Sequence, residues 1–325
     1  MISFFGIVLG VVILIAGGTA LVRGASEIAA RFGISPMVIG LTVVAFGTSA
    51  PELVVNIFGA LSGATGLAFG NVVGSNIGNL GLVLGAAAIM SPIAIRGQIV
   101  RREVPLLLLA TTMMMVMSLD RPLENLPPAI RRTEAIVLLL MFCIVIYITA
   151  LDFLRVQKQD PLLNGIVKGP ASFASGSGRY RWLLALGGFA LLFVGGELTI
   201  RYGVAFATQM GVSPAIIGLF VVAIGTSMPE LATSIIAAMR GQPDLALGNV
   251  IGSNIFNSLI VLPVSGAIAE ISVPSGGVGD LLISWLLVAS LIPLFVFGRA
   301  YLGRRAGAFL LIVYFGYAIY RIQGV

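Results

Sequence analysis

The sequence contains no histidine and a single cysteine, Cys143. The lack of histidine removes the side chain that most often ligates zinc and relays protons near neutral pH. One cysteine cannot form an internal disulfide or a cysteine metal cluster. Charged residues are also scarce, at 10% of the chain, whereas a soluble domain carries about 25%. With 58% hydrophobic residues, the composition predicts an all-α integral membrane protein.

Ten apolar stretches are long enough to cross a bilayer, which takes about 20 helical residues. The expected spans are 3–22, 36–60, 67–90, 103–119, 133–153, 181–200, 213–239, 245–269, 280–298 and 306–321. The segment 155–180 is rich in Gly, Pro and Ser and is typical of a flexible linker. It divides the chain into two halves, 1–154 and 181–325, with five expected spans each.

The two halves carry an internal repeat. Residues 17–79 align without a gap with 195–257, and about half of the positions are identical. The repeat cores cover about 36–90 and 213–269. Because each half has an odd number of spans, the second copy enters the membrane from the opposite side. Such inverted repeats are typical of secondary transporters, whose substrate site lies near the midplane between the halves.

Each repeat contains two groups of polar residues inside apolar stretches. The first group is Thr48, Ser49 and Glu52, matched by Thr226, Ser227 and Glu230. The second group is Asn71, Ser75, Asn76 and Asn79, matched by Asn249, Ser253, Asn254 and Asn257. A carboxylate inside the membrane is costly and needs a partner, yet no Lys or Arg lies within the four repeat-core spans. Other acids, such as Glu27 and Asp280, are expected in solvent near span ends.

Two prolines precede the glutamates. Pro51 and Pro229 each remove a backbone hydrogen bond, which predicts breaks around Ala45–Gly47 and Ala223–Gly225. Freed carbonyls, carboxylates, hydroxyls and amides are hard oxygen ligands that suit calcium or sodium. For the four asparagines that flank this set two interpretations stay open, ion binding or interhelical hydrogen bonding. These are Asn71, Asn76, Asn249 and Asn254.

The motif Gly-Thr-Ser-x-Pro-Glu, followed by Gly-Asn-x-x-Gly-Ser-Asn, resembles the α-1 and α-2 repeats of the cation/calcium exchanger superfamily. Within it, the chain is most similar to the prokaryotic sodium/calcium exchanger branch. The resemblance implies ten transmembrane helices in two inverted five-helix repeats, with no enzymatic activity and no cofactor. It implies antiport of sodium against calcium across the cell inner membrane, through one site exposed alternately to each side. The ion-binding positions that it implies are Ala45, Thr48, Ser49, Glu52, Ser75, Asn79, Ala223, Thr226, Ser227, Glu230, Ser253 and Asn257.

The resemblance also implies individual roles. Glu52 and Glu230 would ligate calcium and share it with sodium, together with the backbone carbonyls of Thr48 and Thr226. The Ala45 carbonyl, with the Thr48 and Ser75 side chains, would form one sodium site. The Ala223 carbonyl, with the Thr226 and Ser253 side chains, would form the other. Ser49, Ser227 and Asn79 would line the centre, and spans one and six would slide against the core.

One position departs from part of the superfamily. Some relatives, including the potassium-dependent branch, carry Asp where this chain has Asn257. With Asn there, the midplane holds two carboxylates only, which argues against potassium co-transport.

Alternatives remain open on the residues alone. A proton/calcium antiporter is possible in principle if burial lets Glu52 and Glu230 titrate. A passive cation channel and an intramembrane enzyme with a carboxylate dyad are the other classes. The repeat with predicted kinks favours alternating access over an open pore, and the hydroxyl and amide residues argue against a proteolytic dyad.

Charge distribution predicts the orientation. The net charge of +6 is better explained by membrane topology than by nucleic-acid binding. The ten-span arrangement places 14 of the 19 basic residues on the side of the linker, so we expect a cytoplasmic linker and both termini outside. The expected partners are therefore the lipid bilayer and the ions Ca²⁺ and Na⁺. Since one chain contains both repeats, a monomer suffices.

Overall fold

The computed structural model describes residues 2–32, 36–94, 102–119, 127–159, 178–210, 223–297 and 301–323. Within these ranges the chain is almost entirely helical, as the composition predicts. Most of the linker and the beginning of the expected span 213–239 lie outside the described residues.

The helices of the first half are α1 (Ile2–Phe32), α2 (Pro36–Ile39), α3 (Ala45–Thr48), α4 (Ala50–Leu61), α5 (Thr65–Gly78), α6 (Leu84–Met90), α7 (Val104–Met117) and α9 (Arg132–Gln159). Those of the second half are α11 (Gly178–Gln209), α13 (Ala223–Thr226), α14 (Met228–Met239), α15 (Pro243–Phe256), α16 (Leu262–Ile268), α17 (Gly277–Phe297) and α18 (Arg304–Gln323). Among the described residues, π-helical turns at Gly40–Val44, Asn79–Val83 and Asn257–Val261 join successive α-helical pieces. The strands are β1 (Ile93–Ala94), β2 (Ala129–Ile130), β3 (Ile271–Ser272) and β4 (Tyr301–Leu302).

Each expected span has a helical counterpart, but not every counterpart is long. Among the described residues seven helices are long and apolar enough to cross a membrane, or eight when the bent segment 36–61 counts as one. The apolar helices Val104–Met117 and Met228–Met239 are shorter. The multi-span helical membrane fold is thus confirmed, while the number ten remains a prediction.

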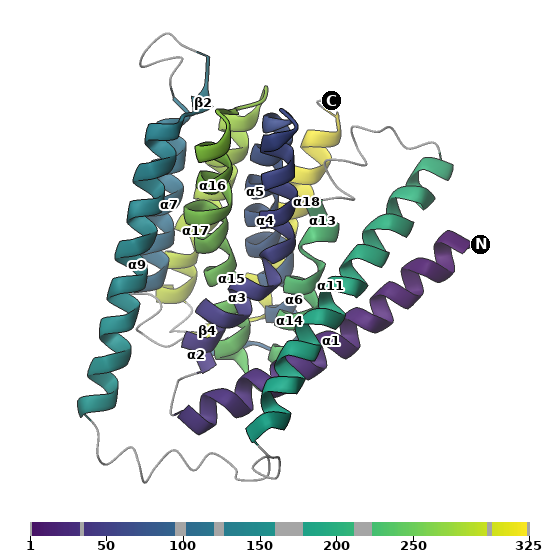
Figure 1. Ribbon diagram of the computed structural model, residues 1–325, viewed down its shortest axis with the longest axis vertical. Helices are drawn as coiled ribbons and strands as arrows, with labels where there is room; N and C mark the ends of the chain where they lie inside the picture. The colour runs from purple at the N-terminus through teal and green to yellow at the C-terminus, as the bar shows by residue number, and fades with distance from the viewer. Residues whose placement is uncertain are drawn as a thin grey trace.

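The repeat cores run in opposite directions. In Figure 1 the chain descends from α5 to α6, whereas it ascends from α15 to α16. Likewise, it ascends from α3 to α4 and descends from α13 to α14. The matched segments are therefore inverted relative to each other, and α15 packs against α3 between them.

Two long helices, α1 and α11, form a pair that crosses the bundle obliquely (Figure 1). Glycines allow their backbones to touch. A Cβ atom added to Gly17 would lie 2.7 Å from the Leu192 nitrogen, and one added to Gly188 would lie 2.5 Å from the Leu21 nitrogen. Small residues permit this close approach in membranes. Gly10 and Gly195 make a second such contact. On each helix the two glycines are seven residues apart, so the close contact repeats along the pair.

Two short antiparallel strand pairs connect the halves at opposite ends of the bundle. Strand β1 pairs with β4, and β2 pairs with β3, so each pair joins a loop of one repeat to a loop of the other. Beside each pair an arginine donates to the last carbonyls of a helix. Arg304 Nε donates to the Ile89 carbonyl at 3.2 Å, and Arg132 Nη2 to the Ile268 carbonyl at 3.1 Å. These contacts tie the halves together at both ends.

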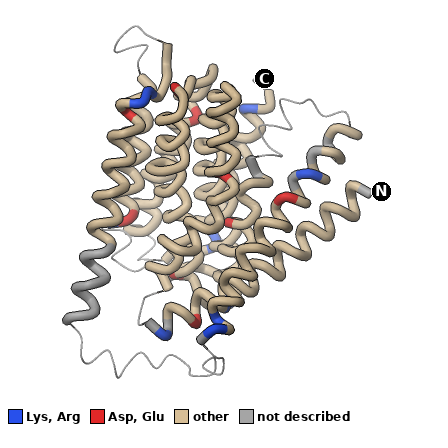
Figure 2. The backbone as a smooth tube through the Cα atoms, viewed as in Figure 1, with Lys and Arg blue, Asp and Glu red and all other residues tan. Residues whose placement is uncertain are grey.

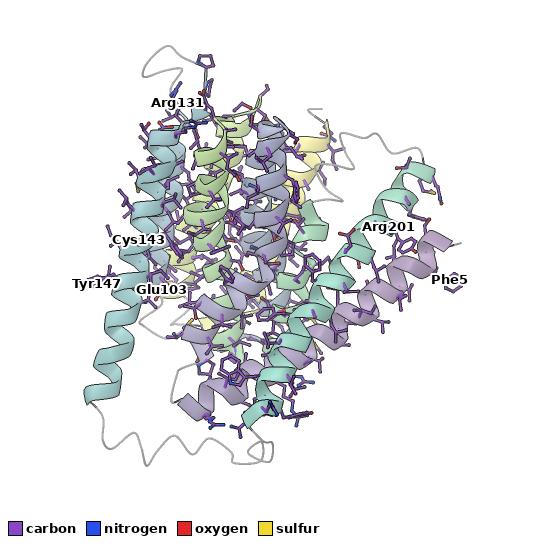
Figure 3. The ribbon with its side chains drawn as sticks, in the orientation of Figure 1. Phe5, Glu103, Arg131, Cys143, Tyr147 and Arg201 are labelled. Atoms are coloured by element: carbon purple, nitrogen blue, oxygen red, sulfur yellow. The ribbon has the colours of Figure 1, made fainter. Side chains whose placement is uncertain are left out.

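The outer surface of the bundle is apolar. Phe5, Cys143 and Tyr147 point outward from α1 and α9, and the two aromatic side chains are more than half exposed (Figure 3). Lys and Arg lie mostly near helix ends, and few charged residues lie along the flanks of the bundle (Figure 2). This distribution suits a lipid environment.

Two acids differ from the expectation that they are solvated. Glu27 is buried. Its carboxylate forms salt bridges with Arg23 Nε at 3.1 Å and with Arg181 Nε at 3.5 Å, and the second of these links α1 to α11. Asp280 is also buried; its Oδ1 accepts the Tyr317 hydroxyl at 3.0 Å and lies 3.2 Å from the Arg321 guanidinium. Arg181 and Arg321, which pair with these acids, lie on other helices. A position near the end of a span therefore did not reveal that the acids are buried.

Candidate ion-binding site

The site begins with two helix breaks. Ser49, between α3 and α4, leaves helical geometry at φ −87° and ψ 6°, and Ser227, before α14, does so at φ −84° and ψ 5°. The axis bends by 44° across Ser49. Both breaks lie two residues beyond the predicted intervals, because Pro51 and Pro229 sit in the first turn of the following helix, where a missing N–H is tolerated. Each break points a serine and a glutamate from its helix into the core.

The two glutamates are fully buried and are bound across the repeat boundary. Glu52 and Glu230 both have zero exposure. Ser49 Oγ donates to Glu230 Oε1 at 2.8 Å, and Ser227 Oγ donates to Glu52 Oε1 at 3.3 Å. Each carboxylate therefore accepts a hydrogen bond from the serine of the opposite repeat, which brings both broken helices to one place.

Serines of the next helices complete the carboxylate contacts. Ser75 on α5 donates to Glu52 Oε1 at 3.4 Å, and Ser253 on α15 donates to Glu230 Oε1 at 3.5 Å. The Ser75 and Ser227 hydroxyl oxygens lie 2.8 Å apart. All four serines predicted from the repeat are thus brought together.

The threonines contact asparagines of the opposite repeat. Thr48 Oγ1 donates to Asn249 Oδ1 at 3.1 Å, and Thr226 Oγ1 donates to Asn71 Oδ1 at 3.3 Å. Of the two open interpretations, the interhelical one describes Asn71 and Asn249: their amides bond to neighbouring side chains while their oxygens accept from the site threonines.

Two buried residues behind these asparagines were missed in the sequence. Asn71 Nδ2 donates to Asn56 Oδ1 at 2.7 Å, and Asn249 Nδ2 donates to Ser234 Oγ at 2.9 Å. Asn56 and Ser234 occupy matched repeat positions, each four residues after its glutamate. That spacing, which places them on the glutamate face of the helix, could have identified them.

The centre is closed by asparagines at the π-helical turns. Asn79 and Asn257 begin such turns, a feature that is frequent at functional sites. Asn257 Nδ2 donates to Ser75 Oγ and to Asn76 Oδ1, both at 3.2 Å. Asn254 Nδ2 donates to the Asn76 carbonyl at 3.2 Å. Asn76 and Asn254 thus also connect the repeats.

Several buried oxygens of the site residues have no hydrogen-bond partner among the described residues. They are Glu52 Oε2, Glu230 Oε2, Asn79 Oδ1, Asn254 Oδ1 and Asn257 Oδ1. An uncompensated buried carboxylate costs several kcal/mol, of order 3–5 when a charge partner is missing. Carboxylate and amide oxygens of this kind are the ligands that a hard cation prefers.

The two alanines of the expected site begin short helices at matched repeat positions. Ala45 begins α3; its carbonyl accepts the Ser49 N–H at 3.0 Å and lies 3.4 Å from the Thr48 hydroxyl oxygen. Ala223 begins α13 at the matched position. No cluster of three or more acidic, histidine or cysteine side chains occurs in the described ranges, so two carboxylates provide the charge of the site.

Comparison with known proteins agrees with this geometry. A family model described as sodium/calcium exchanger protein matches residues 2–151 and 180–323. The chain belongs to the sodium/calcium exchanger family. Among the family relatives is a putative antiporter CaxA of Alkalimonas amylolytica, 36% identical over 98% of both chains. The sodium/calcium exchanger MaX1 of Methanosarcina acetivorans is 31% identical, with 84% of this chain and 85% of that protein covered.

A solved exchanger shares the architecture. The structure of the sodium-calcium exchanger NCX_Mj soaked with Na⁺ and Ca²⁺ superposes with a TM-score of 0.79 at 30% identity, covering 97% of both chains. The sodium/calcium exchanger family comprises membrane transporters, not enzymes. This exchanger-family chain is accordingly a transmembrane antiporter that carries calcium against another cation.

Proposed function

We propose that the protein exchanges sodium for calcium by alternating access, through one midplane site between two inverted repeats of five transmembrane helices. The observation that carries this proposal is the buried pair Glu52 and Glu230, each held by a serine of the other repeat. Two carboxylates balance one Ca²⁺, whereas Na⁺ ions must arrive in number to replace it.

The proposed ligand roles are those that the family resemblance implies. Glu52 and Glu230 bind calcium, assisted by the carbonyls of Thr48 and Thr226, while Asn79 and Asn257 supply central oxygens. Flanking sodium sites use the Ala45 carbonyl with Thr48 and Ser75 on one side. The mirrored set on the other side is the Ala223 carbonyl with Thr226 and Ser253.

The moving part is the α1–α11 pair. Its glycine contacts and the Glu27 ion pairs hold the two helices together, while strand pairs β1–β4 and β2–β3 fasten the remaining bundle at both ends. We propose that the pair slides as one unit across the core and exposes the site to each side in turn.

The proposed topology puts the linker in the cytoplasm and both termini outside. In Figure 1 the end of α9 and the beginning of α11 lie at the bottom, and the end of α18 lies at the top. Both facts support a single orientation with the linker and the C-terminus on opposite sides. The chain holds both repeats, so we propose that it acts as a monomer.

Flux measurements test the proposed coupling. In proteoliposomes, calcium uptake should follow an outward sodium gradient and should ignore potassium and pH gradients imposed separately. Uptake driven by a pH gradient and indifferent to sodium would favour a proton/calcium antiporter. Calcium flux that needs no counter-ion would indicate a channel.

The Ser49 hydrogen bond should contribute strongly to calcium affinity. A hydrogen bond to a charged group contributes roughly 1.5–3 kcal/mol. We therefore expect Ser49→Ala to weaken apparent calcium affinity about 10- to 100-fold, measured as the half-saturating calcium concentration for flux. Ser62→Ala is the control, since Ser62 donates to the Gly59 carbonyl near the end of α4. Equal affinities for both variants would exclude the proposed role of Ser49.

A third carboxylate at the centre should change the coupling. Asn257 touches Ser75 and Asn76, so Asn257→Asp places a new charge beside Glu52 and its serines. We expect calcium flux by this variant to become dependent on potassium or on pH, because the added charge needs another cation or a proton. Flux with the same ion dependence as the unmodified protein would argue that Asn257 lies outside the ion site.

A further inference from the structure

A second, charged site lies outside the transport pathway, at the end of the bundle where β4 leads into α18 (Figure 1). An open groove of about 800 Å³ is formed there by the end of α17, β4 and the first turns of α18. Leu294, Phe297 and Phe309 contribute its apolar wall, and Arg304 and Arg305 contribute its charge. The groove thus joins an apolar surface to two exposed guanidinium groups.

The arginines of this groove have no acidic partner in the part of the chain that the structure describes. The sequence contains no Asp or Glu after Asp280, and Asp280 itself is paired with Arg321 in the last turn of α18. Among the described residues no carboxylate lies within salt-bridge distance of Arg304 or Arg305. The N-terminus of α18, a helix of 20 residues, adds a partial positive charge at the same place.

The opposite end of the molecule provides an internal comparison. There Arg131 and Arg132 lie at the beginning of α9, much as Arg304 and Arg305 lie at the beginning of α18, and Arg132 makes the equivalent helix-capping contact. However, Glu134 Oε2 accepts the Arg131 N–H at 2.7 Å, so that this end carries an acid (Arg131 is marked in Figure 3). The matching residues of α18, Ala306–Ala308, carry none.

We propose that the α17–α18 groove binds the anionic headgroup of a phospholipid from the leaflet at this end of the bundle. The arginines would bind the phosphodiester, since a guanidinium matches phosphate geometry, and Phe297 and Phe309 would contact the acyl chains. Basic pockets between transmembrane helices bind acidic lipid headgroups in this manner. Phe297 is 84% exposed, which is consistent with a side chain that contacts lipid.

Native mass spectrometry of the full-length protein tests this proposal. With equimolar phosphatidylglycerol and phosphatidylcholine, the protein should retain phosphatidylglycerol preferentially. Arg305→Gln should lower this retention about fivefold, the effect of one basic residue near an anionic lipid. Arg131→Gln, at the acid-bearing end, should leave it unchanged. Arg305 is the better position than Arg304, which also caps α6 through the Ile89 carbonyl.

Three outcomes would overturn the proposal. They are equal retention of the two lipids, equal loss in Arg305→Gln and Arg131→Gln, and displacement of the lipid by millimolar inorganic phosphate. The last outcome would show a free-anion site. Should Arg305→Gln fail to yield folded protein, Phe297→Gln provides a second comparison, in which retention of phosphatidylglycerol should be reduced.

Discussion

Replacing Glu52 by Gln is expected to abolish sodium-dependent calcium transport. The substitution keeps the size of the side chain and its contacts with Ser75 and Ser227, but removes one of two buried charges. Breaking a buried charge interaction by removing one partner costs roughly 3–5 kcal/mol. Calcium affinity should therefore fall at least about 100-fold, measured by equilibrium calcium binding to the purified protein and by flux.

Matched variants separate charge from folding. Glu230→Gln should have an effect of similar size, because Glu230 occupies the same position in the inverted copy. Glu270→Gln, which changes an exposed acid before β3, should transport normally. If Glu52→Gln retained calcium-driven sodium exchange, Glu52 would not be a ligand and the site would have to lie elsewhere.

A leucine at Gly188 is the second substitution with a large expected effect. The new side chain would meet the backbone of Leu21 and the Gly17 carbonyl at 2.5 to 2.9 Å, and backbone atoms cannot move aside without separating α1 from α11. Overpacking of this kind costs roughly 1–3 kcal/mol. Because the helices would no longer move as one unit, we expect exchange to slow at least about tenfold while the core site persists.

The neighbouring residue supplies the control. A Cβ atom at Gly187 meets nothing within 4 Å, so Gly187→Leu should transport at the unmodified rate. Measuring calcium binding alongside flux distinguishes a motion defect from a damaged site, since Gly188→Leu should still bind calcium. Equal flux for the two variants would contradict the coupled motion of α1 and α11.

The repeat made most of the site predictable. An offset of 178 residues paired Glu52 with Glu230 and each serine with its counterpart, and the structure brings these side chains into contact. The matched positions indicated which side chains would meet, because a buried carboxylate without a basic neighbour needs a compensating partner. Ion binding by these residues stays a prediction.

Other features depend on contacts between distant segments. The strand pairs connect residues about 140 to 210 positions apart, and two-residue strands leave no pattern in a sequence. Glu27 is buried against α11, where Arg181 is its partner. The residues next to Glu27 in the sequence give no indication of this contact. The helix breaks were predicted two residues too early in the sequence. A proline is tolerated in the first turn of a helix, so the break lies directly before the new helix that contains the proline.

Calcium binding to the purified protein, titrated at several sodium concentrations, tests the central claim that both repeats share one cation site. The account predicts one calcium per chain, competitive displacement by sodium, and loss of binding in both Glu52→Gln and Glu230→Gln. Two independent calcium sites, each lost in only one of these variants, would contradict it.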